Sequence, residues 1–447
     1  MQIIPLFIRQ RINHRPTLIK IIDNIGWLFF GQILRISIGL IIGVWIARYL
    51  GPEQFGLLSF VTAFVSIFGA ISGLGLKSIV VRDIVRDPSV KNETLGTAAM
   101  LQFIGGLLAY VLITASIFWV RPDDALAKAL AAILGSMLLF KASEVAAYWF
   151  ESQVLSKYTV WVQNGSFVVL ASIKVALLLH SAPLIAFAWA ITAEALMVAL
   201  LMLVMLNLRG PRLRQLSITL ARAKELLVDS WPLLLSTAVL MVQARIDQIM
   251  LGTMIDDYAV AQYSVALRIV ETASVCSMIL HSTFMPSIIV AKKESNEAYL
   301  GKLAAFYKLN MLVAIFIALP IAMYSYPIIK VLFGSDYLAA SPILALMTVR
   351  LIFAHLGVAR SIYLLNENLM KYSAITMIVG TIFNIIFNYF LIPVYGGMGA
   401  TATSLFSFAI TIFLIDIFYL KTRTNALLML KSAISCGSLL ERRSWRF

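Results

Sequence analysis

Residues 25–47 read IGWLFFGQILRISIGLIIGVWIA, an apolar run with one charged side chain, Arg35. A helix of this length rises roughly 35 Å, which is enough to cross a hydrocarbon core of about 30 Å. The run is too long for the hydrophobic region of a signal peptide and has no small-residue cleavage site after it. We therefore expect a helix that stays in the membrane.

Eleven similar runs follow along the 447 residues, separated by polar connectors. The chain is 61% hydrophobic and 13% charged, with a mean hydropathy of +0.90, which is typical of a polytopic membrane protein. We predict an all-α protein with about twelve transmembrane helices. The predicted segments are 25–47, 56–76, 96–119, 129–150, 159–180, 183–206, 231–252, 259–289, 304–326, 338–364, 372–392 and 397–420.

The connectors alternate between basic and nearly uncharged. Of the 36 lysines and arginines, 25 lie in the connectors that share a face with both ends of the chain. The opposite connectors hold Arg48, Arg121, Lys128 and Lys330. The positive-inside rule then places both termini and the middle loop in the cytoplasm. The net charge of +14 fits loops that face anionic lipid and does not call for a nucleic-acid partner.

The polar stretch 207–230 divides the predicted helices into six and six. It contains Gly210 and Pro211, which end a helix, between flanking arginines. Since each lobe has an even number of spans, both lobes start on the same face, as in a parallel repeat related by an axis along the membrane normal. We predict a basic N-terminal segment (1–24), a six-helix lobe (25–206), a cytoplasmic linker (207–230), a second lobe (231–420) and a basic tail (421–447), interfacial or disordered.

The chain shows no sign of a cofactor or a metal site. There is no G-x-x-x-x-G-K-[ST] motif, and no connector is long enough for a nucleotide-binding domain. Cys276 and Cys436 have no spacing for a metal or a disulfide framework, and the four histidines are scattered over different segments. Any transport should run on a gradient or on the substrate itself.

Charged residues inside the apolar segments are the strongest functional signal. Each costs about 2.5–3.5 kcal/mol near the centre of a membrane helix, so we expect these side chains to face a polar interior. The cations are Arg35, Lys141, Lys174, Arg245, Arg268, Arg350 and Arg360, and the acids are Glu144, Glu194, Asp247, Glu271 and Asp416.

Spacing indicates which of these charges can pair within one helix. Lys141 with Glu144, and Arg268 with Glu271, are three residues apart and share a helical face. Tyr148 and Glu151 extend the Lys141 face. Arg245 and Asp247 are two residues apart and point about 160° away from each other, so they should have different partners. Arg360 and Asp416 lie near cytoplasmic ends and fit a structural ion pair or snorkelling side chains.

The remaining cations predict a cationic cavity. Arg35, Lys141, Arg245 and Arg350 lie near the middle of their spans, and Lys174 lies nearer the outer end. Excess positive charge at this depth suits an anionic substrate, and guanidinium groups suit phosphate oxygens. We therefore predict these five as substrate-binding residues. Glu144, Glu194, Asp247 and Glu271 are predicted coupling or pairing acids.

Four motifs add a family resemblance: RYLGPEQFG at 48–56, GLGL at 73–76, FGSDY at 333–337, and LIPVYGGMGA at 391–400, which follows Asn384 and Asn388. Over roughly residues 24–420 the chain resembles the O-antigen and capsule repeat-unit flippases of the multidrug/oligosaccharidyl-lipid/polysaccharide exporter superfamily. The motif residues lie at loops and helix ends, where Gly and Pro set turns, so we interpret them as structural.

The resemblance implies a MATE-like transporter in which two six-helix bundles face each other in a V. It implies transfer of an undecaprenyl-pyrophosphate-linked oligosaccharide across the bacterial inner membrane by alternating access. A glycan polymerase and glycosyltransferases of the same pathway are the implied partners. The protein would not be an enzyme.

Two other functions stay open at this point. A drug or organic-cation antiporter of the same superfamily would prefer an acid-dominated interior, whereas this interior is rich in cations. A membrane glycan polymerase or ligase would need a sizeable external loop with catalytic residues, and the outer connectors are short.

Overall fold

The computed structural model describes residues 16–434, and every regular element in this range is helical. This confirms the predicted all-α class. Residues 1–15 of the predicted N-terminal segment and residues 435–447 of the predicted tail, including Cys436, lie outside the described residues.

Ten helical stretches of the described chain are long and apolar enough to cross a membrane. Eight of them contain one long helix each, and the other two are continuous runs of shorter elements. The long helices are α2 (Pro16–Gly73), α4 (Lys91–Val120), α7 (Lys157–Leu179), α8 (Leu184–Arg209), α9 (Leu220–Met254), α10 (Asp257–Glu294), α11 (Asn296–Met323) and α15 (Met370–Ala409). The composite stretches are α5 (Ala125–Gly135), η2 (Ser136–Ser143) and α6 (Glu144–Ser152), and α13 (Ala340–Met347) and α14 (Val349–Asn366).

The two longest helices each bend at a glycine. Gly51 in α2 has φ 72° and ψ 171°, and Gly396 in α15 has φ 53° and ψ −131°. Both fall in the gaps between predicted segments, 47–56 and 392–397. Each of the two bent helices therefore contains most of two predicted segments. When their two parts are counted separately, the ten stretches correspond to the twelve predicted segments. The number of membrane crossings itself stays a prediction.

The four sequence motifs coincide with these backbone turns. The glycines of the described chain with positive φ are Gly51, Gly75, Gly334 and Gly396, one in each motif. This conformation is costly for a residue that carries a Cβ atom. At Gly56 glycine is required for a different reason, close packing, because a Cβ atom there would lie 1.8 Å from the carbonyl oxygen of Asp257. The motifs are therefore structural, as predicted.

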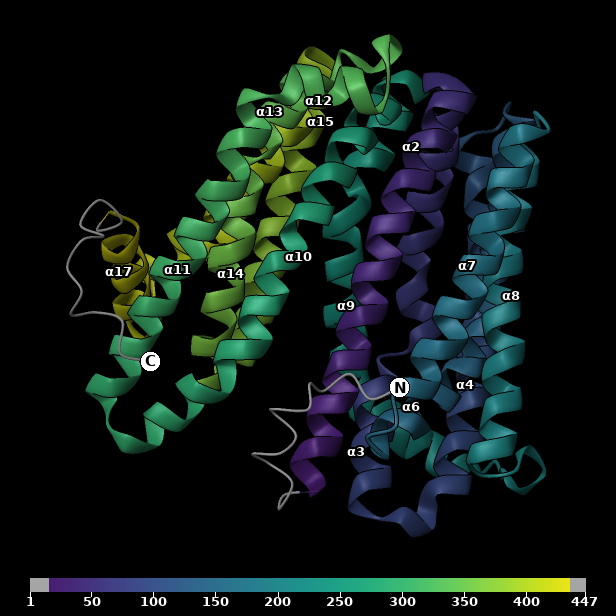
Figure 1. Ribbon diagram of the computed structural model, residues 1–447, viewed down its shortest axis with the longest axis vertical. Helices are drawn as coiled ribbons and strands as arrows, with labels where there is room; N and C mark the ends of the chain where they lie inside the picture. The colour runs from purple at the N-terminus through teal and green to yellow at the C-terminus, as the bar shows by residue number, and fades with distance from the viewer. Residues whose placement is uncertain (1–15, 435–447) are drawn as a thin grey trace. The chain divides into compact units, whose positions relative to one another are not determined.

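The chain forms two compact units. Among the described residues, the first consists of 16–50 and 61–241, and the second of 51–60 and 242–434. In the first unit α7 packs along α8 (Figure 1), and α4 packs against η2. Its core contains Leu95 of α4, Tyr148 of α6 and the buried face of α3 (Leu76–Arg86).

The start of α9 belongs to the first unit. Ala223 and Leu226 are buried in the same core as Leu76 and Leu95. A Cβ atom at Gly75 would lie 2.7 Å from the backbone nitrogen of Leu234, so α9 also lies close against the turn before α3. The helix thus begins at Leu220, inside the stretch expected as a linker, and its residues up to Met241 pack with the first unit.

In the second unit α11 packs against α10 and α14 (Figure 1). The core holds Phe306 and Tyr307 of α11 and Ile362 of α14. Shorter elements complete this unit: α12 (Ser325–Leu332), the π-helical turn η5 (Ile410–Leu414), α16 (Ile415–Phe418) and α17 (Leu420–Ile434).

The helix α17 shows that the predicted tail is not disordered up to Ile434. It packs against α11 and α14, and Ala426 and Met429 are buried. Asn425 is fully buried and accepts a hydrogen bond from the Tyr307 hydroxyl at 2.9 Å. Polar residues therefore supply part of the packed face, which explains why the hydrophobic pattern was too weak to predict it.

Candidate functional site

Lys141 lies on a cavity of about 570 Å³ in the first unit. Its position comes from η2, an eight-residue 3₁₀ segment in the middle of the fourth predicted span. A Cβ atom added at Gly69 or Gly73 of α2 would lie 4.0 Å from the Lys141 Nζ atom. The two glycines therefore leave open space beside the ammonium group.

The Lys141 ammonium group has few interactions with the protein. Its ion pair is with Glu144 Oε1 at 3.8 Å, which is beyond hydrogen-bond distance, and it makes no hydrogen bond in the described part of the chain. The other Glu144 oxygen, Oε2, accepts a hydrogen bond from the Tyr148 hydroxyl at 3.0 Å. That hydroxyl accepts a bond from Gln102 Nε2 at 2.9 Å. The predicted Lys141–Glu144 pair exists, but it is loose.

Lys174 is satisfied by a partner on another helix. Its ammonium group donates to Glu194 Oε2 at 2.7 Å, and the two side chains are 12% and 26% exposed. This geometry marks a structural ion pair between α7 and α8. The prediction that Lys174 binds substrate therefore has the weakest support among the five cations.

Arg35 lies in the first unit on α2, four residues from Gly31 and from Gly39. A Cβ atom at Gly31 would meet Asn164 and Val160 of α7 at 2.8 Å, so this face of α2 lies close to α7. The Arg35 Nε atom is buried and has no hydrogen-bond partner. Its guanidinium is thus partly available.

Two cations of the set, Arg245 and Arg350, belong to the second unit. Arg245 lies 3.3 Å from Glu271 of α10 and 3.4 Å from the side-chain oxygen of Gln248. Arg350 stacks over the Phe408 ring at 5.1 Å and lines a narrow crevice with Tyr263 and Ser404. In the described chain Arg350 makes no ion pair and no hydrogen bond.

Asp247 has different partners from Arg245, as the two-residue spacing predicted. It is 4% exposed and accepts hydrogen bonds from Tyr263 at 2.6 Å, from Asn388 at 2.7 Å and from the Ser404 hydroxyl. No basic side chain within residues 16–434 forms an ion pair with it. Of the four predicted coupling or pairing acids, Asp247 is thus the acid held by neutral donors alone.

The pair of Arg360 and Asp416 is confirmed as structural. Arg360 donates two hydrogen bonds of 2.7 Å to the two carboxylate oxygens, and the residues are 5% and 0% exposed. Tyr372 donates a third bond to Asp416 at 2.8 Å. A buried bidentate pair with this geometry fixes one helix against another and marks a structural contact.

Comparison with known proteins places these residues in a family. Residues 21–289, more than half of the chain, match the family described as Polysaccharide biosynthesis protein. The chain belongs to this family. Comparison with curated proteins gives no match.

Solved structures show the same fold. An inward-facing multidrug resistance MATE family transporter of the MOP superfamily has a TM-score of 0.69 at 18% identity, covering 89% of this chain and 96% of that one. The lipid II flippase MurJ, in an inward closed conformation, has a TM-score of 0.70 at 15% identity, covering 94% and 91%. An outward-facing MATE family transporter has a TM-score of 0.61 at 17% identity, covering 92% and 96%. The protein is a multi-pass membrane protein with a MATE-like transporter fold.

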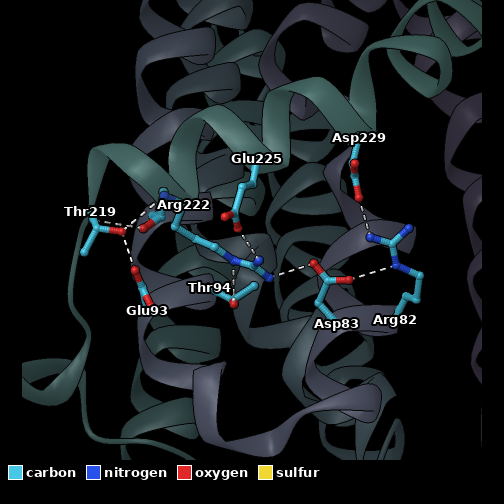
Figure 2. Close-up of polar contacts among 9 residues, drawn as sticks. Arg82, Asp83, Glu93, Thr94, Thr219, Arg222, Glu225 and Asp229 are labelled. Atoms are coloured by element: carbon cyan, nitrogen blue, oxygen red, sulfur yellow. Dashed lines mark hydrogen bonds and ion pairs between the residues drawn. The ribbon is translucent and has the colours of Figure 1, made fainter.

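This family member also has a dense polar cluster where the predicted topology places the cytoplasm. Figure 2 shows Arg222 of α9 donating to Asp83 at 2.7 Å, to Glu225 at 2.9 Å and to Thr94 at 3.2 Å. Arg82 donates to Asp83 at 2.8 Å and bridges it to Asp229 at 2.5 Å. The cluster joins α3, α4 and α9 within the first unit.

The cluster does not form an anion site. It lines a hollow of about 530 Å³. Basic and acidic side chains line this hollow in equal number, and Arg82 and Arg222 already have carboxylate partners. Nearby, the hydroxyl and backbone amide of Ser89 donate to Asp87, which lowers the pKa of that carboxyl.

The sequence did not indicate two residues of this region, one that lines the cavity of the first unit and one that supports its wall. Lys77 lines the same cavity as Lys141 and pairs with Glu151 at 2.9 Å. In the sequence it directly follows the predicted segment 56–76, so it belongs to a basic connector. Gln102 supports Tyr148 from α4. A polar residue in the apolar run 96–119 was the available signal for Gln102.

The structure does not bring the five predicted cations into one described site. Arg35, Lys141 and Lys174 belong to the first unit, and Arg245 and Arg350 to the second. Among residues 16–434, no group of three or more His, Cys, Asp or Glu side chains is placed to hold a metal ion.

Proposed function

We propose that this protein is a flippase of the bacterial inner membrane, with both termini in the cytoplasm. It would move undecaprenyl-pyrophosphate-linked oligosaccharide units from the cytoplasmic to the outer face by alternating access. Membership of the polysaccharide biosynthesis family supports the substrate class. The fold that it shares with MurJ and the MATE transporters supports a transport mechanism without catalysis.

The observation that carries the proposal is the ammonium group of Lys141. It lies on a large cavity, makes no hydrogen bond in the described chain and has its acid 3.8 Å away. An ammonium group inside a membrane helix is expensive, so its retention needs a compensating interaction. A phosphate oxygen is a strong acceptor for such a donor. Arg35 and Arg350, which also keep unused donors, are the next candidates for the anionic substrate.

Outward movement of an anion can use the membrane potential. An inside-negative potential contributes about 2.3 kcal/mol per charge per 100 mV, so no ATP is required for this step. Asp247 is the proposed coupling acid because it is buried without a basic partner in the described chain. An acid in this setting can exchange a proton or a small cation as its surroundings change.

The cavity lining argues against an organic-cation antiporter. The charged residues that line it are Lys77, Lys141 and Glu144, so positive charge is in excess. An organic cation would be repelled from this position, whereas a phosphate group would be attracted.

The proposal is tested by replacing Lys141 in a strain that lacks its own copy of the gene. We expect Lys141→Gln to reduce surface glycan at least tenfold while the amount of membrane-inserted protein stays within twofold, because one charge-assisted contact to phosphate contributes about 1.5–3 kcal/mol. Lys141→Arg should restore most of the export.

The matched control is Lys174→Gln, which removes a cation that is already hydrogen-bonded to Glu194. This change should lower protein abundance, and export per molecule of protein should stay normal. Normal export by the combined variant Lys141→Gln, Arg35→Gln and Arg350→Gln would rule out a cationic substrate site.

A further inference from the structure

We infer that the cavity in the first unit binds the phosphate end of an isoprenoid lipid, with the first isoprene units of the chain held against its apolar wall. This inference rests on the proposed function and deepens it. It assigns to the protein a part of the substrate that would otherwise stay in the surrounding lipid.

Two lysines form the polar end of the cavity. Lys141 lies beside Gly73, and Lys77 follows the turn at Leu74 and Gly75, both of which have positive φ. Both side chains line the cavity, and Lys77 is 60% exposed. Since Gly69 and Gly73 carry no side chain, a phosphate group can approach the Lys141 ammonium from the α2 side.

Tyr148 keeps the competing acid away from this end. Its hydroxyl donates to Glu144 Oε2 at 3.0 Å, while Glu144 Oε1 stays 3.8 Å from Lys141. Gln102 donates to the Tyr148 oxygen at 2.9 Å and so fixes the hydroxyl. Tyr148 is therefore a positioning residue, because it holds the Glu144 carboxylate too far from Lys141 for a hydrogen bond.

The rest of the wall is mostly apolar and belongs to five elements. Val65, Leu134, Leu138, Ile191 and Met241 line it from α2, α5, η2, α8 and the part of α9 in the first unit. A sugar would leave most of its hydroxyl groups without partners against such a wall, at a cost of about 1–3 kcal/mol for each unsatisfied group. A hydrocarbon chain has no polar group to satisfy, so it can move from the surrounding lipid to this apolar wall without that cost.

The volume limits how much of a lipid can enter. At about 570 Å³, the cavity has the size of a site for one small molecule. It can hold a phosphate group with a short piece of chain, and the oligosaccharide must lie elsewhere. The cavity thus recognises the junction that all substrates of this lipid class share.

The test is a binding measurement on the purified full-length protein in nanodiscs made of uncharged lipid. The probes are farnesyl pyrophosphate, inorganic pyrophosphate and farnesol, with phosphatidylglycerol as a competitor. We expect farnesyl pyrophosphate to bind at least tenfold more tightly than either inorganic pyrophosphate or farnesol, because it alone carries both the anion and the chain. Phosphatidylglycerol should not displace it at equal concentration.

Three variants separate the parts of the site. Lys141→Gln should weaken farnesyl pyrophosphate about tenfold. Met137→Trp should fill the apolar part of the cavity, weakening farnesyl pyrophosphate while leaving inorganic pyrophosphate within twofold. Leu196→Trp, at a 40% exposed position of α8 that does not line the cavity, is the matched control and should change neither.

The role of Tyr148 needs its own pair of variants. Tyr148→Phe frees Glu144 to close on Lys141, so affinity should fall about as far as in Lys141→Gln. Tyr148→Phe with Glu144→Gln should restore it, which a purely structural role for Tyr148 would not produce.

Equal binding of inorganic and farnesyl pyrophosphate, displacement by phosphatidylglycerol, or no effect of Met137→Trp would each overturn the inference. The proposed function would survive these results if Lys141→Gln still lost export in cells. Conversely, tight farnesyl pyrophosphate binding by the unaltered protein, with normal export when Lys141, Arg35 and Arg350 are all replaced, would overturn the cationic substrate site of the proposed function and leave the lipid-binding cavity in place.

Discussion

At the residue scale, the cations of the predicted membrane segments fall into two groups, those that are hydrogen-bonded to a carboxylate and those that are not. Lys174 and Arg360 donate to carboxylates at 2.7 Å. Lys141 and Arg350 make no hydrogen bond in the part of the chain that the structure describes. The first kind should matter for stability, because removing one partner strands a buried charge. The second kind should matter for binding.

The ion pair of Lys174 and Glu194 offers a direct test of this separation. Lys174→Ala should destabilise the protein by about 3 kcal/mol and lower its abundance in membranes, because Glu194 is left without its cation. Lys174→Ala with Glu194→Ala should recover most of the loss. Quantitative immunoblotting of the membrane fraction measures both, and equal abundance of the single and double variants would contradict the assignment.

Arg350 tests the value of the guanidinium group. Its fork of donors can grip phosphate in a bidentate manner, and its plane stacks on Phe408 at 5.1 Å. Arg350→Lys should therefore keep only part of the export, and Arg350→Ala less still, with protein levels unchanged. Full export by Arg350→Lys would show that charge alone suffices at this position.

Charge contacts could be predicted from the sequence only when both partners lie on the same helix. The spacing of Lys141 and Glu144 was sufficient, since helical geometry fixes their separation. The partners of Lys174, Glu271 and Asp247 lie on other helices, at sequence separations that depend on the packing of those helices. No spacing rule reports on such contacts.

At the element scale, the bends in the long helices depend on backbone conformation more than on packing. Gly51 has φ 72° and ψ 171°, and a Cβ atom there would meet nothing within 4 Å. We predict that Gly51→Ala destabilises the protein by about 1–3 kcal/mol through backbone strain alone.

The control for Gly51 is Gly165→Ala in α7. That position also has nothing within 4 Å of the added carbon atom, but it lies inside a regular helix. Alanine should be neutral or stabilising there by up to about 1 kcal/mol. Thermal unfolding followed by intrinsic fluorescence compares the two, and equal midpoints would refute the account of the bend.

Most helices were predictable because each apolar run must be about as long as the membrane is thick. The exceptions have physical reasons. The packed face of α17 includes Thr422 and Asn425, so hydrophobicity did not reveal it. The beginning of α9 is rich in charge, and its helix is stabilised by tertiary ion pairs such as Arg222 with Asp83.

At the scale of the whole molecule, the charge alternation predicts the topology. A fluorescent protein inserted within residues 210–219 should be active, because this loop is predicted to be cytoplasmic. Alkaline phosphatase inserted at Asp256 and Asp257 should be active, because that loop is predicted to be external. Paired alkaline phosphatase and fluorescent protein fusions measure this. The reverse pattern of signals would refute the predicted orientation.

The polar cluster around Arg222 should determine how firmly α9 is attached to the first unit. Arg222 and Asp83 are 15% and 14% exposed and lie 2.7 Å apart. In a double-mutant cycle, Arg222→Ala and Asp83→Ala should show a coupling energy of about 0.5–3 kcal/mol in thermal unfolding. Additive losses would mean that the two residues act independently.

In the fourth predicted span, the 3₁₀ segment η2 couples the length of the span to the rotation of its end. A 3₁₀ helix rises about 2.0 Å per residue and turns 120°, whereas an α-helix rises about 1.5 Å and turns 100°. Runs longer than about four residues are uncommon, and this one has eight. Rewinding all of it into α-helix would shorten the span by about 4 Å and rotate α6 by roughly 160° relative to α5. A change of pitch would thus turn the Glu144 and Tyr148 faces of α6 through almost half a revolution without breaking the helix.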